Sequence, residues 1–286
     1  MKIALIVNTG KQAAISCAEK IANQFLQNGA EVYMPKKCGA YYDNAGIMFV
    51  SNHFELFDVC DLAVTVGGDG TIIHSAKHAA KYDKPMIGVN VGRLGFAAEV
   101  EPEHIEDLNR LLSGDYELQL RMLLSVSVKH KDGSTEDFLA VNDATLARGH
   151  MSRIIDISIS LDHSPITTYR ADGVLFSTPT GSTAYALSAG GPVISPQMEC
   201  VLLTPICPHS LISRSVLFES DALLTAKVQV NDDTKAILSI DGEKNIEITA
   251  DDVVIIKKSD ETLKLITLYK RNFYQLLNEK LKERKA

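Results

Sequence analysis

The chain has 286 residues and a formal net charge of −7, with 45% hydrophobic and 23% charged residues, which is ordinary for a globular protein. The acidic balance argues against a general nucleic-acid binder, and no apolar run reaches the roughly 18 residues of a membrane span. The first apolar run is too short for a signal peptide. Five cysteines without C-x-x-C spacing indicate reduced thiols. We therefore expect a cytoplasmic protein of one or two domains, without nucleic-acid or membrane partners.

The first third of the chain predicts strands that alternate with helices. Unbroken apolar runs at residues 3–7 and 62–66 are typical of strands covered on both faces. Residues 30–34 and 85–89 are predicted as two more strands. Apolar residues at three- and four-residue spacing predict helices over 14–26, from residue 71 onward, and over 102–113. Strands separated by helices imply a parallel sheet with right-handed crossovers.

The pattern changes near residue 115. From about 118 to 268 we find short strands, two-residue alternation such as 155–161, and hairpin signals at Asp132-Gly133 and Asp241-Gly242. Residues 272–284 are predicted as a helix. We therefore expect an α/β domain with a parallel sheet over residues 1–115. A β-rich, sandwich-like domain over 116–268 and a C-terminal helical segment over 269–286 would follow.

The first motif is Gly67-Gly68-Asp69-Gly70-Thr71, between a predicted strand and a predicted helix. Parallel sheets place ligands there, outside the carboxyl ends of their strands. Glycines let backbone N–H groups approach phosphate oxygens, and the helix N-terminus adds partial positive charge. The negative charge of Asp69 would repel a phosphate if the residue only bound it. Asp69 is therefore better suited to act as a base, to position a hydroxyl, or to bind a metal ion that is itself bound to phosphate.

A simpler alternative is a tight turn in which Asp69 only caps the helix. The chain contains no G-x-x-x-x-G-K-[ST], no G-x-G-x-x-G after the first strand and no G-x-S-x-G. An enzyme of phosphate chemistry with this sequence would therefore not be a P-loop protein.

Two further motifs suit a nucleotide. Asn142-Asp143 could bind an adenine edge and ribose hydroxyls, although an Asn-Asp turn at a strand end is the alternative. Residues 170–192 read RADGVLFSTPTGSTAYALSAGGP, a run of hydroxyls and small residues that suits a flat, phosphate-linked ligand. Helix capping through Ser182 or Thr183 would explain only a few of these residues.

Together these segments resemble the NAD kinase family, the ATP-dependent enzymes that convert NAD to NADP. The similarity covers nearly the whole chain in order. Besides the three motifs it includes Gly92-Arg93-Leu94-Gly95-Phe96 and Ile206-Cys207-Pro208-His209-Ser210-Leu211. Gly-Gly-Asp-Gly is shared with lipid kinases and phosphofructokinases, whereas Thr-Pro-Thr-Gly-Ser-Thr-Ala-Tyr is specific to NAD kinases.

The resemblance implies transfer of the γ-phosphoryl group of ATP to the 2′-hydroxyl of the adenosine ribose of NAD. Asp69 would be the catalytic proton acceptor, and Mg²⁺ or a similar divalent cation would accompany ATP, with no protein residue assigned as a metal ligand. The residues implied to bind the nucleotides are Gly67, Gly68, Gly70, Thr71, His74, Phe96, Asn142, Asp143, Arg153, Arg170, Asp172, Thr180, Thr183, Ala184, Tyr185, Ala186, Leu187, Ser188 and Glu243.

Three of these positions depart from the common family pattern. His74 stands where many members carry Arg, Asp143 where many carry Glu, and Glu243 where Gln is common. The family also implies a homo-oligomer, a dimer or tetramer, with dinucleotide sites near subunit interfaces. An acidic protein that binds two polyanions must concentrate positive charge locally, and the candidate arginines are Arg93, Arg148, Arg153 and Arg170.

Two other functions compete. A lipid kinase of the diacylglycerol or sphingosine type would share the glycine loop, but it would lack the Thr-Pro-Thr-Gly-Ser-Thr-Ala-Tyr run and associate with membranes. A non-catalytic dinucleotide sensor would keep the binding loops without turnover, and the retained Asp69 argues against it. His74 and His78 lie four residues apart but lack the H-E-x-x-H pattern and a third ligand, so we expect a surface or pocket-lining pair.

Overall fold

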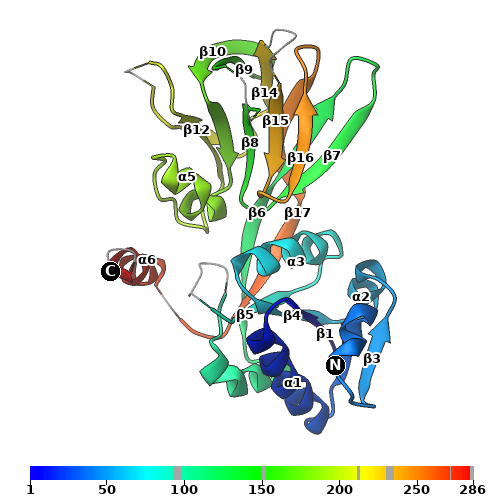
Figure 1. The fold of residues 1–286 in the computed structure, drawn as a ribbon. Coiled ribbons are helices and arrows are strands. Elements are labelled where there is room, and N and C mark those ends of the chain that lie inside the picture. Colours follow the sequence, from blue (N-terminus) through cyan, green and yellow to red (C-terminus); the bar gives the residue numbers. More distant parts are fainter. Residues whose placement is uncertain (93–97, 150–152, 211–212, 230–234, 271, 284–286) are drawn as a thin grey trace. The chain divides into compact units, whose positions relative to one another are not determined.

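A computed structural model describes residues 1–92, 98–149, 153–210, 213–229, 235–270 and 272–283. The chain forms two compact units (Figure 1): Met1–Leu120 with the described residues from Leu263 onward, and the described part of Arg121–Thr262. Strands β6 (Glu117–Lys129) and β17 (Val253–Thr267) contribute residues to both units. We keep the predicted three-part division at 115/116 and 268/269 as a proposal beside this contact-based one.

The first unit is built on a parallel sheet, as predicted. Its strand order is β3-β2-β1-β4-β5, and Leu265 of β17 pairs in parallel with Met86. Neighbouring strands are parallel throughout. The order reverses between β1 and β4, which is the switch point where parallel α/β sheets bind ligands. The strands are β1 (Lys2–Val7), β2 (Glu31–Pro35), β3 (Ile47–Val50), β4 (Leu62–Gly67) and β5 (Met86–Asn90).

Helices cover both faces of this sheet (Figure 1). Leu5 and Val7 share an apolar cluster with α1 (Gln12–Gln27). Ile6 points to the other side, where it lines a pocket with α3 (Asp69–Lys81). Because β1 and β4 lead into helices on opposite faces, the loops that follow them separate and leave room between their ends.

Some elements differ from the prediction. Three elements were not predicted from the sequence: β3, the short 3₁₀ helix η1 (Lys36–Ala40) and α2 (His53–Val59). Strand β3 has only four residues with no clear alternation of burial. Helix α2 did carry a signal, since the Asn52 Oδ1 N-cap accepts from the Glu55 backbone N–H at 2.9 Å, as N-caps do.

The predicted helix over 102–113 also differs. It is a 3₁₀ segment, η2 (Pro102–Asn109), with non-helical dihedrals at His104, followed by one turn of helix, α4 (Arg110–Ser113). The predicted C-terminal helix is confirmed as α6 (Phe273–Glu283). Among the described helices, none is long and apolar enough to cross a membrane.

The second unit confirms the β-rich prediction. One antiparallel sheet has the order β13-β12-β11-β8-β15-β16, and a second layer contains β10, β9, β14 and β17 with β6 and β7. Inward-facing residues of both layers, such as Phe176 and Leu224, share one apolar core, as in a sandwich. The remaining strands are β7 (Thr135–Ala140), β8 (Asp143–Arg148), β9 (Ile155–Leu161), β10 (Ser164–Ala171), β11 (Gly173–Ser177), β12 (Cys200–Ile206), β13 (Val216–Glu219), β14 (Leu224–Gln229), β15 (Ala236–Ile240) and β16 (Lys244–Ile248).

A histidine joins two turns of this unit. The His130 ring lies between two carboxylates, with Nδ1 3.0 Å from Asp252 Oδ1 and Nε2 3.2 Å from Glu136 Oε1. Its pKa is raised, first by the hydrogen bond to Asp252 and then by that to Glu136. Burial pushes the Asp252 pKa up, but hydrogen bonds from Thr249 and His130 outweigh it and lower that pKa. When His130 is protonated, its imidazolium therefore ties the β6–β7 hairpin to the β16–β17 turn.

We expect this tie to make stability fall on the alkaline side. A raised folded-state pKa gives stability that is complete below the unfolded value of about 6.5 and disappears as pH rises through the folded pKa. The midpoint of thermal unfolding of His130→Gln should therefore differ from wild type most below pH 6.5, and the difference should shrink above it. The control is His104→Gln, an exposed histidine outside this unit. A pH-independent difference would contradict the ionic role of His130.

Candidate functional site

The glycine loop lies at the start of α3. Strand β4 ends at Gly67, and Gly68 occupies the N-cap position without a side-chain cap, so Asp69 is the first helical residue. The alternative in which Asp69 merely caps the helix is therefore wrong. A Cβ at Gly67 would lie only 2.7 Å from Thr71 Oγ1, so glycine is needed for the strand end to contact the first turn of the helix.

Asp69 is exposed, as is Gly70. The Asp69 carboxylate makes no hydrogen bond or ion pair with any residue that the structure describes. It therefore stands beside the exposed N–H groups of the helix start, where a bound anion would be stabilised. A carboxylate in this position can accept a proton from a hydroxyl that approaches the same anion.

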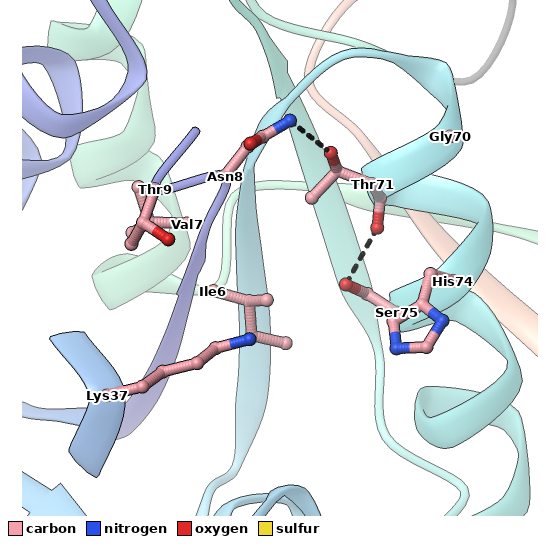
Figure 2. Close-up of a pocket in the computed structure, with 9 residues that line it drawn as sticks. All are labelled: Ile6, Val7, Asn8, Thr9, Lys37, Gly70, Thr71, His74 and Ser75. Atoms are coloured by element: carbon pink, nitrogen blue, oxygen red, sulfur yellow. Dashed lines mark hydrogen bonds between the residues drawn. The ribbon is translucent and has the colours of Figure 1, made fainter. Parts of the chain in front are cut away.

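A pocket of about 320 Å³ opens beside this loop (Figure 2). The Asn8 side-chain amide donates to Thr71 Oγ1 at 3.1 Å, and Ser75 Oγ donates to the Thr71 carbonyl at 2.9 Å. These bonds fix the polar wall where β1 ends and α3 begins. The lining residues are Ile6, Val7, Asn8, Thr9, Lys37, Gly70, Thr71, His74 and Ser75.

Three predicted residues, Gly70, Thr71 and His74, line this pocket. The sequence reading missed Asn8, Thr9 and Lys37. A signal existed for the first two, because they follow a buried strand as Gly67 does. Lys37 comes from η1, an element with no apolar periodicity to reveal it.

His74 and His78 form an aromatic group in the first unit. Their ring centroids are 5.4 Å apart at 73°, and His78 stacks on Phe57 at 5.9 Å and 21°. Within the described ranges, no group of three or more His, Cys, Asp or Glu is arranged to hold a metal ion. His74 lines the pocket, and its ring packs edge-on against that of His78.

In the second unit, the Asn142-Asp143 pair and the hydroxyl-rich run come together. The Thr178 backbone N–H and Ser177 Oγ donate to the Asn142 carbonyl at 2.9 and 3.1 Å. Thr178 Oγ1 donates to the Val141 carbonyl at 2.7 Å. Antiparallel pairing of β8 with β11, with Ser177 opposite Asp143, causes this meeting. The two motifs therefore form one folded unit of loops.

Asp241 holds the same loops from a third direction. Its carboxylate accepts backbone N–H bonds from Val141 at 3.0 Å, Asn142 at 2.7 Å and Asp143 at 3.0 Å. The sequence reading recognised Asp241 only as part of a hairpin turn. Pairing of β15 with β8 brings this turn to the Asn142-Asp143 pair, so Asp241 is a positioning residue.

Several hydroxyls of the run are structural. Ser182 Oγ donates to the Pro179 carbonyl at 2.7 Å and accepts the Ile194 N–H at 3.0 Å, while Thr183 Oγ1 donates to the Thr180 carbonyl at 3.2 Å. Ala186 is fully buried in a small apolar cluster. The main chain of Ala186 is buried as well, and its carbonyl accepts the Gly191 N–H at 2.8 Å.

Other residues of the run are oriented differently. Tyr185 and Ser188 of α5 (Tyr185–Ser188) are exposed, and Ala184 and Leu187 are partly so. Thr180, in the 3₁₀ turn η3 (Thr180–Thr183), has a buried Oγ1 with no hydrogen-bond partner among the described residues. The ligand roles of all these residues stay predictions.

The other predicted residues of this unit lie at the opposite end of β8. Arg148 Nε contacts Asp172 Oδ1 at 2.7 Å, and the Arg148 N–H donates to the Asp172 carbonyl at 2.9 Å. Arg148 lies roughly 17 Å from Asp143, at about 3.4 Å per residue. Arg170 and Arg153 are exposed near this end, because Ala171 pairs with Ile155. Arg148 is thus engaged by Asp172, so its charge is partly neutralised.

The predicted residues of the second unit therefore form two groups. We call them the Asn142 end, with Asn142, Asp143, residues 180–188 and Glu243, and the Asp172 end, with Arg153, Arg170 and Asp172. Glu243 belongs to the first group because it follows Asp241 in the same turn and is exposed. Arg93 and Phe96 lie outside the described residues.

Comparison with known proteins matches both halves of the chain. The family model described as the ATP-NAD kinase N-terminal domain matches residues 3–116, and that of the C-terminal domain matches residues 141–268. The NAD kinase of Natranaerobius thermophilus is 36% identical over 280 residues, covering 98% of this chain and 97% of that protein. The NAD kinase of Caldanaerobacter subterraneus is 35% identical over 286 residues, covering 99% of each.

Two solved structures share the fold. Yeast NADH kinase complexed with NADH gives a TM-score of 0.90 at 24% identity, covering 100% of this chain and 89% of that one. An NAD kinase from Archaeoglobus fulgidus in complex with ATP gives 0.74 at 24% identity, covering 99% of each. With both domain models matched in order and relatives above 30% identity along nearly the whole length, this chain belongs to the NAD kinase family.

Proposed function

We propose that this protein is an ATP-dependent NAD kinase, which transfers the γ-phosphoryl group of ATP to the 2′-hydroxyl of the adenosine ribose of NAD and forms NADP. The carrying observation is the position of Asp69. It is an exposed carboxylate without a described partner, at the start of a helix and beside a sheet switch point. Membership of the family supplies the identity of the two substrates.

Asp69 would act as the proton acceptor. As the ribose oxygen bonds to the γ-phosphorus, the bond from that phosphorus to the β,γ-bridging oxygen breaks and ADP leaves. The hydroxyl proton passes to the Asp69 carboxylate. Phosphoryl transfer needs positioning and neutralised charge more than covalent participation, and the N–H groups of the first turn of α3 supply part of that neutralisation.

The residues of the loop fit a divalent cation that arrives with ATP. Mg²⁺ commonly binds through one or two carboxylates together with substrate phosphates and water, and the loop offers one carboxylate, Asp69. The described residues provide no cage of three ligands. Such an ion would neutralise phosphate charge, with Asp69 the residue placed to contact it.

The Asn142 end would bind the adenosine half of NAD. Its backbone is fixed by three N–H bonds to Asp241 and by Thr178, so the Asn142 side chain and the exposed residues of α5 can face a ligand without reorganisation. Residue Asp143 is buried, with 6% of its surface exposed, and its carboxylate accepts from Thr145 Oγ1 at 3.2 Å. We therefore propose that Asn142 makes more of the direct contacts with the adenosine half of NAD than Asp143 does.

The decisive assay measures NADP formation by purified protein given NAD, ATP and Mg²⁺, read through an NADP-specific dehydrogenase. A lipid kinase would instead phosphorylate diacylglycerol or sphingosine in vesicles. A sensor would bind NAD in calorimetry without turnover. Absence of NADP formation, with either of those results, would refute the proposal.

We also propose a homo-oligomer in which one copy contributes its Asp172 end to the dinucleotide held by the Asn142 end of another. The separation of the two ends along β8 motivates this. Asn142→Ala and Asp172→Ala should each be inactive alone, because each disrupts every site. Co-expressed, they should regain about a quarter of wild-type activity, because mixed assemblies contain some intact sites. No recovery in assemblies shown to be mixed would contradict the shared site.

The five cysteines are all free thiols, four of them buried, which motivates assignment to the reducing cytoplasm. Fractionation of the source cells would test this assignment, and recovery outside the cytoplasmic fraction would overturn it.

A further inference from the structure

Two exposed lysines from different elements lie near the glycine loop or line the pocket beside it. Lys11, just before α1, places Nζ 3.7 Å from the Cβ position that a side chain at Gly68 would take, and equally near that of Gly92. Gly92 has φ of +146°, so glycine is favoured there. The Lys11 ammonium therefore reaches the backbone that follows both β4 and β5.

Lys37 lines the pocket from the wall opposite Gly70 (Figure 2). It extends from η1 into the pocket that Gly70 and Thr71 line, and Figure 2 shows its chain directed toward Ile6 and the interior of the pocket. Thr9 presents its hydroxyl in the same view. Lys11 thus lies beside Gly68 and Gly92, whereas Lys37 lies across the pocket from Gly70 (Figure 2).

Lys11 and Lys37 bring two positive charges to this loop and its pocket, and the single Asp69 carboxylate offsets only one of them. Neither lysine side chain makes a hydrogen bond or ion pair with a described residue, Asp69 included. The N-terminal end of α3 carries partial positive charge of its own. Cations gathered at such an end repel one another and the helix dipole, so a bound polyanion is the partner that would lower this electrostatic energy.

We propose that Lys11 and Lys37 bind the phosphate chain of the phosphoryl donor. The inference rests on the proposed function and adds two residues to it. The groups available here, two ammonium ions, helix N–H groups and the Thr9 hydroxyl, recognise phosphate oxygens, not a base. Their contribution should therefore appear as affinity for the donor and leave the affinity for NAD unchanged.

The test compares Lys11→Gln, Lys37→Gln and the double variant with two controls. Lys20→Gln lies on α1 and Lys36→Gln in η1, both exposed and outside the pocket lining. We expect each site variant to raise the KM for ATP about 10-fold, as loss of a charge-assisted hydrogen bond does. The KM for NAD should change by less than about twofold, and Lys→Arg variants should retain most of the ATP affinity.

Calorimetry without NAD compares binding of two molecules that carry a phosphate chain, ATP and inorganic tripolyphosphate. If the lysines read the chain itself, ATP and inorganic tripolyphosphate should both bind more weakly to the double variant. Weakening for ATP alone would indicate nucleoside contacts and overturn the assignment. A double variant with a KM for ATP within twofold of wild type, or with equal loss for ATP and NAD, would also overturn it.

The same experiments keep the two proposals apart. Wild-type protein that binds tripolyphosphate through the lysines but forms no NADP would remove the proposed activity and leave the lysine site standing. If the wild-type protein forms NADP and the lysine variants keep its KM for ATP, the proposed activity would stand and the lysine site would be removed.

Discussion

Replacing Asp69 with asparagine should lower kcat by a factor on the order of 10² to 10⁴, the contribution typical of a positioned general base. Asparagine has almost the same shape as aspartate but cannot take up the hydroxyl proton. NAD binding should survive within about twofold, because we propose that the Asn142 end supplies the adenosine contacts. Steady-state NADP formation and calorimetry with NAD would measure the two quantities separately.

The substitution should affect folding little, because the exposed Asp69 side chain makes no bond with the described residues and its interaction with the helix dipole contributes only about 0.3–1 kcal/mol. The midpoint of thermal unfolding should stay within about 4 °C of wild type. Asp58→Asn, an exposed aspartate on neighbouring α2, is the matched control and should keep full turnover. Wild-type-like kcat in Asp69→Asn would remove Asp69 from the proton-accepting role.

The parts of the fold that could be predicted are those with local signals. Strands β1 and β4 are uninterrupted apolar runs, and α1 has one apolar face that ends before Gly29, whose φ is +78°. The hairpin turns at Gly133 and Gly242 also have positive φ, as the Asp-Gly signals predicted. Each of these features depends on residues within a few positions of one another.

The parts that could not be predicted depend on the register of distant strands. Thr178 meets Val141 only because β11 pairs antiparallel with β8, and Asp241 arrives only through β15. The same register places Asp172 at the far end of β8, so residues that the resemblance grouped together are split. Lys37 is similar, because nothing in residues 36–40 indicates that η1 lies beside the start of α3.

The contact between the two motifs predicts a second large effect. A Cβ at Gly181 would lie 2.1 Å from the Asn142 carbonyl oxygen, 2.5 Å from its carbon and 2.6 Å from Ser177 Oγ. The first two are backbone atoms, so Gly181→Ala cannot be accommodated by a rotamer change. The Asn142-Asp143 turn must move away from Thr178 and Asp241, which hold it. We expect a loss of about 1 to 3 kcal/mol in unfolding free energy, the usual cost of overpacking.

Binding should suffer more specifically than stability. Displacement of the Asn142 end should lower the affinity for NAD at least about 10-fold, as measured by calorimetry. The affinity for tripolyphosphate at the α3 loop should stay within about twofold of wild type. The control is Gly39→Ala, whose Cβ would meet its nearest atom, in Phe49, at an ordinary 3.8 Å. If Gly181→Ala kept both its unfolding midpoint and its NAD affinity, the hydrogen bonds between the two motifs would not be what shapes the adenosine site. If it lost NAD and phosphate binding together, the substitution would have unfolded the protein more widely than this local clash explains.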